Sequence, residues 1–201
     1  MLRLDHLAIS CARLEDGVAA VETLCGVPMA GGGQHAAMST HNRLLGLGDL
    51  YLEVIAVDPA APPPGRARWF DLDRFSGPPR LTNWIVATDD MGDTLASGPP
   101  GWGTPLSLAR GDYRWQMAVP DDGRLPHDNT WPALIQWHGT LHPALVLPDH
   151  GLRLARLTVS HPQASALQRA LALTDPRVDF VTGPASLRAV IDTPKGPVTL
   201  P

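Results

Sequence analysis

Two ionisable side chains interrupt apolar runs near the start of the chain. His6 lies within LDHLAI at 4–9, and Glu53 lies within YLEVI at 51–55. Both runs are predicted strands, where a charged side chain is costly unless it is paired or bound. An imidazole and a carboxylate can together bind a divalent metal and leave positions for water or substrate. Without a metal, Glu53 is expected to be a general base with a raised pKa, beside His6.

Composition indicates an ordinary globular protein. The chain has 201 residues, a net charge of −4, 44% apolar and 18% charged residues, which is enough for one large domain or two small ones. It lacks the concentrated basic surface that nucleic acid or an anionic membrane requires. No apolar run is long enough to span a bilayer and no signal sequence opens the chain, so we expect a cytoplasmic protein. Cys11 and Cys25 flank a predicted helix that separates them by roughly 20 Å, so they are not expected to form a disulfide.

A repeated order of elements predicts the architecture. The 21 prolines and 19 glycines favour many short strands and turns. A strand, a helix and then further strands are predicted in three successive segments, which gives an α+β fold of repeated βαβββ units. The expected units are a first at 1–57, a Pro-rich connector at 58–79, a second at 80–143 and a third, divergent one at 151–201, within what can be one compact domain.

The first segment resembles the glyoxalase-like branch of the vicinal oxygen chelate superfamily. The likeness is carried by LDHLAI at 4–9, THNRLLGLG at 40–48 and YLEVIA at 51–56, and it weakens beyond residue 143. It implies βαβββ units paired into a curved mixed sheet around an open cleft. In that superfamily the cleft holds a divalent metal, which chelates neighbouring oxygens of a substrate. The metal ligands lie on the first and last strand of each paired unit.

Carried onto this chain, the resemblance implies His6 and Glu53 as the catalytic pair and as metal ligands. The metal is zinc, iron, manganese or nickel, with its identity left open. In the second unit the matching positions hold Trp84, which cannot bind a metal, and Gln136, a weak oxygen ligand. The implied metal set is therefore His6, Glu53 and Gln136, with Trp84 as a substrate contact.

His41 is a further candidate whose orientation depends on the register of the hairpin at 41–57. A three-residue loop would pair odd with odd residues and turn His41 into the cleft with Glu53. A two-residue turn at Gly48-Asp49 would send Asn42 and Leu44 inward instead. The sequence leaves both registers open.

Other polar residues near the expected cleft are candidates for substrate binding. His35 and Arg43 can bind an anionic or carbonyl oxygen. Gln136 and His138 share one face of a predicted strand and can contact substrate. The alternative for that strand is a polar edge exposed to water. The connector carries the aromatic pair Trp69-Phe70 and is either a boundary between units, which we favour, or a loop over a cleft.

Two functions follow from these features. The first is an enzyme that polarises a small oxygen-bearing molecule in the cleft around His6 and Glu53, as a metal-dependent lyase, isomerase or dioxygenase. The second is a non-catalytic protein of the same fold that binds or sequesters a small molecule between tryptophans. A homodimer is a candidate assembly for either. No Gly-x-Ser-x-Gly elbow is present to suggest a serine hydrolase.

Overall fold

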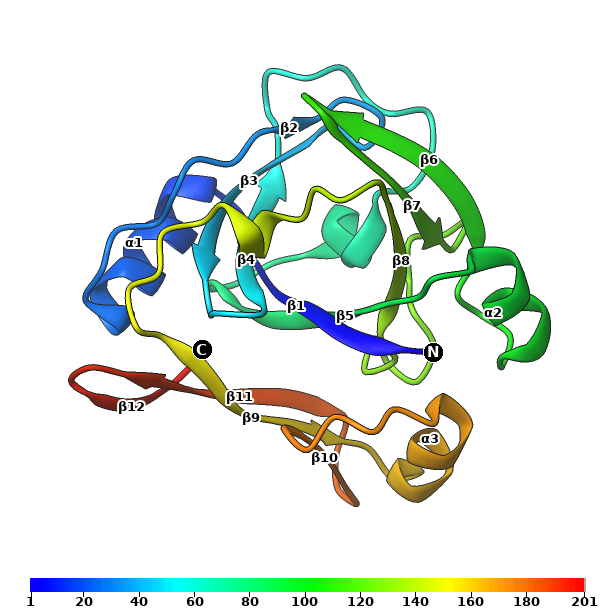
Figure 1. Cartoon of the computed structure of the whole chain (residues 1–201). Coiled ribbons are helices and arrows are strands. Elements are labelled where there is room, and N and C mark those ends of the chain that lie inside the picture. The colour runs from blue at the N-terminus through cyan, green and yellow to red at the C-terminus, as the bar shows by residue number, and fades with distance from the viewer. Residues whose placement is uncertain (201) are drawn as a thin grey trace.

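The structure is a computed structural model that describes residues 1–200. Its strands form an eight-stranded sheet in the order β2-β3-β4-β1-β5-β8-β7-β6 and a four-stranded sheet in the order β10-β9-β11-β12. Figure 1 shows the large sheet strongly curved, with the small sheet as a separate layer beneath β1 and β5. None of the helices in the described part of the chain has the length and apolarity needed to cross a membrane.

The first half of the large sheet is built by the segment that resembles a glyoxalase-like unit. Its elements are β1 (Arg3–Ser10), α1 (Leu14–Cys25), β2 (Gln34–His35), β3 (Thr40–Gly46) and β4 (Tyr51–Val57). Helix α1 buries Leu14, Val21 and Cys25 along one face and ends at Gly26, whose φ of 71° forms a left-handed cap. Cys11 and Cys25 are buried and free, as predicted.

The second half repeats this order in space. It comprises η1 (Trp69–Arg74) in the connector, then β5 (Arg80–Ala87), α2 (Met91–Ser97), β6 (Thr104–Arg110), β7 (Tyr113–Val119) and β8 (Ala133–His138). Strand β1 runs parallel to β4, β5 runs parallel to β8, and β1 meets β5 antiparallel at the centre. Two βαβββ units therefore pair into one curved mixed sheet, which confirms the expected fold class.

The last part of the chain forms the second layer. After η2 (Pro143–Leu145) it contains β9 (Arg153–Ser160), α3 (Ala164–Leu171), β10 (Val178–Val181), β11 (Ser186–Thr193) and β12 (Gly196–Thr199). In this layer β10, the strand that follows α3, lies parallel to β9. In the first two units it is instead the last strand that lies parallel to the first, so the strand order differs. The layers meet where the ring of Trp84 contacts that of Phe180, with centroids 6.1 Å apart.

The β3–β4 hairpin adopts the two-residue turn. Leu44 pairs with Glu53, and a hydrogen bond from the Leu47 amide to the Leu50 carbonyl closes the turn at Gly48-Asp49. Directly paired residues point to the same face of a sheet. Leu44 and Asn42 therefore share the face of Glu53, whereas His41 lies on the opposite face.

A β-bulge interrupts β1 at Asp5. Leu4 pairs with Val86 and His6 with Ile85, so Asp5 has no partner on β5. A bulge re-aims side chains that a regular strand would place on opposite faces. The adjacent side chains of Asp5 and His6 consequently reach each other on one side of the sheet.

Candidate functional site

A small cavity lies on the concave side of the large sheet. Its volume is about 30 Å³, enough for one or two water molecules. Its wall consists of His6, His35, Asn42, Leu44, Tyr51, Glu53, Trp69, Phe70, Arg110, Trp115, Met117, Ile135 and Trp137. All of these side chains are buried except Arg110 and Trp137, which are half-buried. Polar groups come mainly from the first unit, and the second unit supplies mostly apolar wall.

His6 lies between two buried carboxylates. Its Nδ1 is 2.5 Å from Asp5 Oδ1, and its Nε2 is 3.7 Å from Glu53 Oε2. The ring stacks on Tyr51, with centroids 4.3 Å apart and planes 13° from parallel. Because Tyr51 fixes the plane and Asp5 accepts the Nδ1 proton, Nε2 is directed toward Glu53 and the cavity.

The three groups hold one another in their charged forms. Burial alone would lower the pKa of His6, but the hydrogen bonds and charges of Asp5 and Glu53 outweigh it and raise that pKa. Burial alone would raise the pKa of Glu53, but the contact with His6 and the hydrogen bond from Asn42 lower it. The expectation of a raised pKa for Glu53 is therefore wrong, because a positive charge lies beside it.

Asn42 connects Glu53 to the mouth of the cleft. Its Nδ2 donates to Glu53 Oε1 at 2.5 Å, and its Oδ1 accepts from Arg110 Nη1 at 3.0 Å and from the Gly33 amide at 2.9 Å. The aliphatic part of Arg110 lies so close to Gly33 that a Cβ there would be 2.5 Å from Arg110 Cδ. Arg110 thus reaches from the second unit to the first and closes the cavity.

His35 is a neutral member of this cluster. Its Nε2 faces Asn42 Nδ2 at 3.4 Å and Arg110 Nη1 at 3.5 Å, both donors, and its Nδ1 is 3.0 Å from Thr40 Oγ1. These contacts favour the tautomer with the proton on Nδ1. Burial, with the charge of Arg110, lowers the pKa of His35 to about 4.

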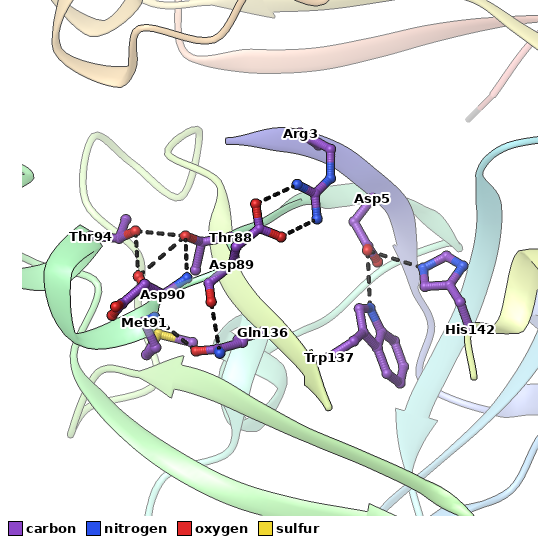
Figure 2. A network of polar contacts seen from close by, with 10 residues as sticks. All are labelled: Arg3, Asp5, Thr88, Asp89, Asp90, Met91, Thr94, Gln136, Trp137 and His142. Carbon is purple, nitrogen blue, oxygen red and sulfur yellow. Dashed lines mark hydrogen bonds and ion pairs between the residues drawn. The ribbon is translucent and has the colours of Figure 1, made fainter. Parts of the chain in front are cut away.

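Asp5 is held from the second unit and from the loop that follows it. Its Oδ2 accepts from Trp137 Nε1 at 3.0 Å and from His142 Nε2 at 3.1 Å, as Figure 2 shows. The Ala144 amide donates to His142 Nδ1, so His142 Nε2 carries the proton. Burial would raise the pKa of Asp5, but the donors His142 and His6 lower it well below its usual range.

Several predicted site residues lie elsewhere. Trp84 faces the second layer, and its Nε1 donates to the Thr130 carbonyl at 2.8 Å. Gln136 lies on the face of β8 opposite to Trp137, where its amide holds the start of α2 through the Met91 amide and the Asp89 carbonyl (Figure 2). The same face of β8 carries His138, which is exposed.

His41 and Arg43 also point away from the cleft, on the outer face of β3, for the register given above. Of the predicted residues, the structure brings together His6, Glu53 and His35. The connector residues Trp69 and Phe70 line the cavity, so the connector covers the cleft in addition to joining the two units.

The donor set does not fit a resident divalent metal. Ile85 on β5 is the direct partner of His6 on β1. Glu53 lies two residues beyond Tyr51, the partner of His6 on β4. In the same way, Ile135 lies two residues beyond Ala133, the partner of Ile85 on β8. The second unit therefore adds no His, Asp or Glu side chain to the cavity wall. Both nitrogens of His6 already face carboxylates. Within residues 1–200 no group of three or more His, Cys, Asp and Glu side chains is placed to hold a metal ion, and catalytic metals usually need three protein ligands.

A family model described as a glyoxalase-like domain matches residues 4–174. The chain belongs to this family. The resemblance to the vicinal oxygen chelate superfamily is thereby confirmed. A comparison of this chain with curated proteins finds no significant match.

Solved structures share the fold. A hypothetical protein from Staphylococcus aureus is 14% identical over 99% of this chain and 84% of its own, with a TM-score of 0.62. A hypothetical protein from Bacillus halodurans C-125 is 12% identical over 70% of this chain and 96% of its own, with a TM-score of 0.48. Methylmalonyl-CoA epimerase from Mycobacterium tuberculosis is 13% identical over 69% and 88%, with a TM-score of 0.43. Only the fold follows from the first of these likenesses, and the other two are too distant to support an argument.

Four polar residues of the site were not predicted from the sequence of the glyoxalase-like domain. Asp5 is the neighbour of His6 and would face away in a regular strand. Asn42 faces inward only in one of the two registers. Arg110 comes from the second unit, and His142 comes from the loop after that unit. The sequence around each of these residues contains no pattern that indicates a contact with the His6 site.

Proposed function

We propose that this glyoxalase-like domain binds a small oxygen-bearing molecule in the His6–Glu53 cleft and transfers a proton on it without a metal. The observation that carries the proposal is the asymmetry of the Glu53 carboxylate. Asn42 holds Oε1 at 2.5 Å, whereas Oε2 accepts no hydrogen bond within residues 1–200 and faces His6 Nε2 at 3.7 Å. Oε2 is therefore the atom available to accept a proton from a ligand.

Three groups on the cavity wall suit an oxygen of the ligand. Trp69 lines the cavity, and its Nε1 is buried without a hydrogen-bond partner in the described chain, so a carbonyl or hydroxyl oxygen of a ligand would supply the missing acceptor. His6 Nε2 offers a second proton, and Arg110 offers a charged donor at the mouth. An oxygen polarised by these donors makes the adjacent C–H bond more acidic, and Glu53 is the base beside it.

Ligand entry requires movement of the wall, because the cavity of about 30 Å³ is smaller than any such molecule. Arg110 and Trp137 are the half-buried members of the wall, and Arg110 is the longer and more flexible of them. We propose that Arg110 exchanges its hydrogen bond with Asn42 for one with the ligand. In the opened cleft, the aromatic and apolar wall of the second unit would contact the remaining part of the ligand.

Proton transfer can be tested by hydrogen exchange. Wild-type protein in D₂O is expected to catalyse exchange of the C–H adjacent to the carbonyl in at least one of dihydroxyacetone, lactaldehyde and pyruvate, followed by ¹H NMR. The variant Glu53→Gln keeps an acceptor for Asn42 but removes the base, so its rate should fall by about 10²-fold or more. Arg43→Gln, on the outer face of the adjacent strand, is the matched control and should exchange at the wild-type rate. Equal rates for wild type and Glu53→Gln would contradict the proposal.

A non-catalytic binding role is the second candidate. It is favoured by the wall that the second unit contributes, where Met117, Ile135, Trp115 and Trp137 offer contact area and little chemistry. In that case a member of the same panel would raise the unfolding temperature in a saturable manner without any exchange of its C–H protons.

A further inference from the structure

His142 does not line the cleft, but it contacts the His6 site from behind. Its Nε2 is 3.1 Å from Asp5 Oδ2, and the other oxygen of that carboxylate is 2.5 Å from His6 Nδ1 (Figure 2). The ring of His142 also packs against those of Tyr51 and Trp137, with centroids 5.7 and 5.2 Å away. A row of three side chains therefore leads from the loop after the second unit, through Asp5, to the imidazole of the cleft.

The backbone of this loop fixes the orientation of the His142 ring. His142 is the N-cap of η2, and the Ala144 amide donates to its Nδ1 at 3.2 Å. A ring nitrogen that accepts a hydrogen bond carries no proton, so the proton of the neutral ring lies on Nε2. The side chain is 22% exposed, on the wall of a pocket of about 680 Å³. Because packing encloses the ring only in part, the bond from the Ala144 amide is what holds Nε2–H toward Asp5.

The same local structure occurs a second time in the chain, directly after β9. In the segment His161-Pro162-Gln163, the Gln163 amide donates to His161 Nδ1 at 3.0 Å. The Nε2 of His161 is 3.7 Å from Oδ2 of the exposed Asp128, which is too long for a hydrogen bond. Two histidines are thus held by the backbone in the same way, and at His142 the opposite end of the ring meets a buried carboxylate.

The Nε2–H of His142 restricts the Asp5 carboxylate. Asp5 Oδ2 accepts from both His142 and Trp137, so the carboxylate cannot rotate without breaking two hydrogen bonds. Its Oδ1 is thereby kept on His6 Nδ1. The bond at Nδ1 in turn sets the direction of His6 Nε2, the group that would donate to an oxygen of the ligand.

We propose that His142 is a positioning residue for proton transfer in the cleft and acts on His6 through Asp5. His142 itself neither touches the ligand nor exchanges a proton with it. The inference rests on the function proposed for the cleft, because it takes His6 Nε2 as a donor to the ligand.

Two substitutions separate the two ends of the His142 ring. In His142→Gln the side-chain amide reaches the position of Nε2 and can donate to Asp5, but the acceptor for the Ala144 amide is lost. In His142→Asn the shorter side chain reaches the position of Nδ1 and keeps that acceptor, but the donor to Asp5 is lost. Each variant keeps one of the two hydrogen bonds, so both should fold.

The first measurement is hydrogen exchange of whichever of dihydroxyacetone, lactaldehyde and pyruvate the wild type exchanges. His142→Asn should lower the rate by about 10-fold or more, the order expected for the loss of one hydrogen bond to a charged group. His142→Gln should recover most of the wild-type rate. A role confined to the loop would give the opposite order, because only His142→Asn preserves the cap of η2.

The second measurement needs no ligand. A buried imidazole N–H that donates to a carboxylate gives a downfield ¹H signal. The signal of His6 Nδ1–H should be displaced in His142→Asn and remain at its wild-type position in His142→Gln. It reports on the contact with Asp5 even if the wild type exchanges none of the three ligands. That failure would contradict the proposed function, whereas an undisplaced signal in His142→Asn would contradict the positioning role.

His161→Asn is the matched control, because it makes the same change in the second His-Pro segment. It should leave the exchange rate and the His6 signal as in the wild type. A loss in His142→Gln equal to or larger than that in His142→Asn would assign the effect to the loop and overturn the proposal. A wild-type rate in His142→Asn would overturn it as well.

Discussion

Replacing Asp5 by asparagine is expected to lower the free energy of unfolding by about 3–5 kcal/mol, the usual cost of removing one partner of a buried ion pair. The Asp5 carboxylate accepts hydrogen bonds from His6, Trp137 and His142. An asparagine offers one acceptor oxygen and places an NH₂ group against the remaining donors. His6 would also lose the partner that fixes its orientation. Urea unfolding at pH 7 measures the change.

The control for this experiment is Asp89→Asn. Asp89 pairs with Arg3 through two contacts of 2.8 Å, so the same chemical change again removes a carboxylate from a cation. The Arg3–Asp89 pair is exposed and screened by solvent, so the variant should be almost as stable as wild type. If Asp5→Asn were as mild as Asp89→Asn, the contacts of Asp5 would contribute little and the proposed organisation of the site would be wrong.

His35 should make the protein sensitive to acid. Its pKa is about 4 in the folded protein against an ordinary 6.5, so between these values the unfolded chain binds a proton that the folded chain does not. Stability therefore falls as the pH is lowered through this window, by roughly 3 kcal/mol at pH 4 from this residue alone. Unfolding free energies measured between pH 7 and 4 should show this slope.

The other ionisable groups with shifted pKa values affect stability in other pH ranges. The raised pKa of His6 gives stability that is fully present below 6.5 and is lost as the pH rises. The lowered pKa values of Asp5 and Glu53 give stability that is lost only when the pH falls below the ordinary range of carboxyl groups. Half-buried His127, whose pKa burial also lowers, adds a smaller slope of the same sign as His35.

His35→Gln should therefore flatten most of the slope between pH 6.5 and 4.5, since glutamine keeps an acceptor for Asn42 and Arg110 and does not titrate. His41→Gln, on the outer face of β3, is the matched control and should keep the wild-type slope. An unchanged slope in His35→Gln would place the acid sensitivity elsewhere in the chain.

The sequence was sufficient to predict the fold class and the position of the cleft. A carboxylate and an imidazole inside apolar strands, within a recurring order of elements, pointed to His6 and Glu53. Both lie in the cavity because β1 and β4 are neighbours and pair in parallel, as the first unit of this fold requires.

Predictions for the second unit failed by one residue. The comparison of the two units that placed Trp84 and Gln136 in the cleft was one residue out on each strand. Both β1 and β5 contain a register shift, at Asp5 and at Thr82, so spacing along these strands does not directly give the face on which a residue lies. Because side chains alternate faces, a shift of one exchanges the cleft residue for its neighbour, and Ile85 and Ile135 take the inner positions. A bulge has no reliable signal in a single sequence.

Long-range contacts account for the other omissions. Arg110 enters the site because the curvature of the sheet brings the end of β6 against Gly33 of the first unit, and His142 enters through the path of a loop. Neither position follows from hydrophobic periodicity, which reports only which face of its own element a residue occupies.

The protonation state of His6 is the most direct test of a cleft that works without a metal. Long-range ¹H–¹⁵N correlation spectra report the state of both ring nitrogens, recorded as a function of pH with and without one equivalent of Zn²⁺. The geometry predicts an imidazolium that titrates above the ordinary value of about 6.5 and is unaffected by Zn²⁺. Titration at or below that value, or a metal-dependent shift of Nε2, would contradict the account.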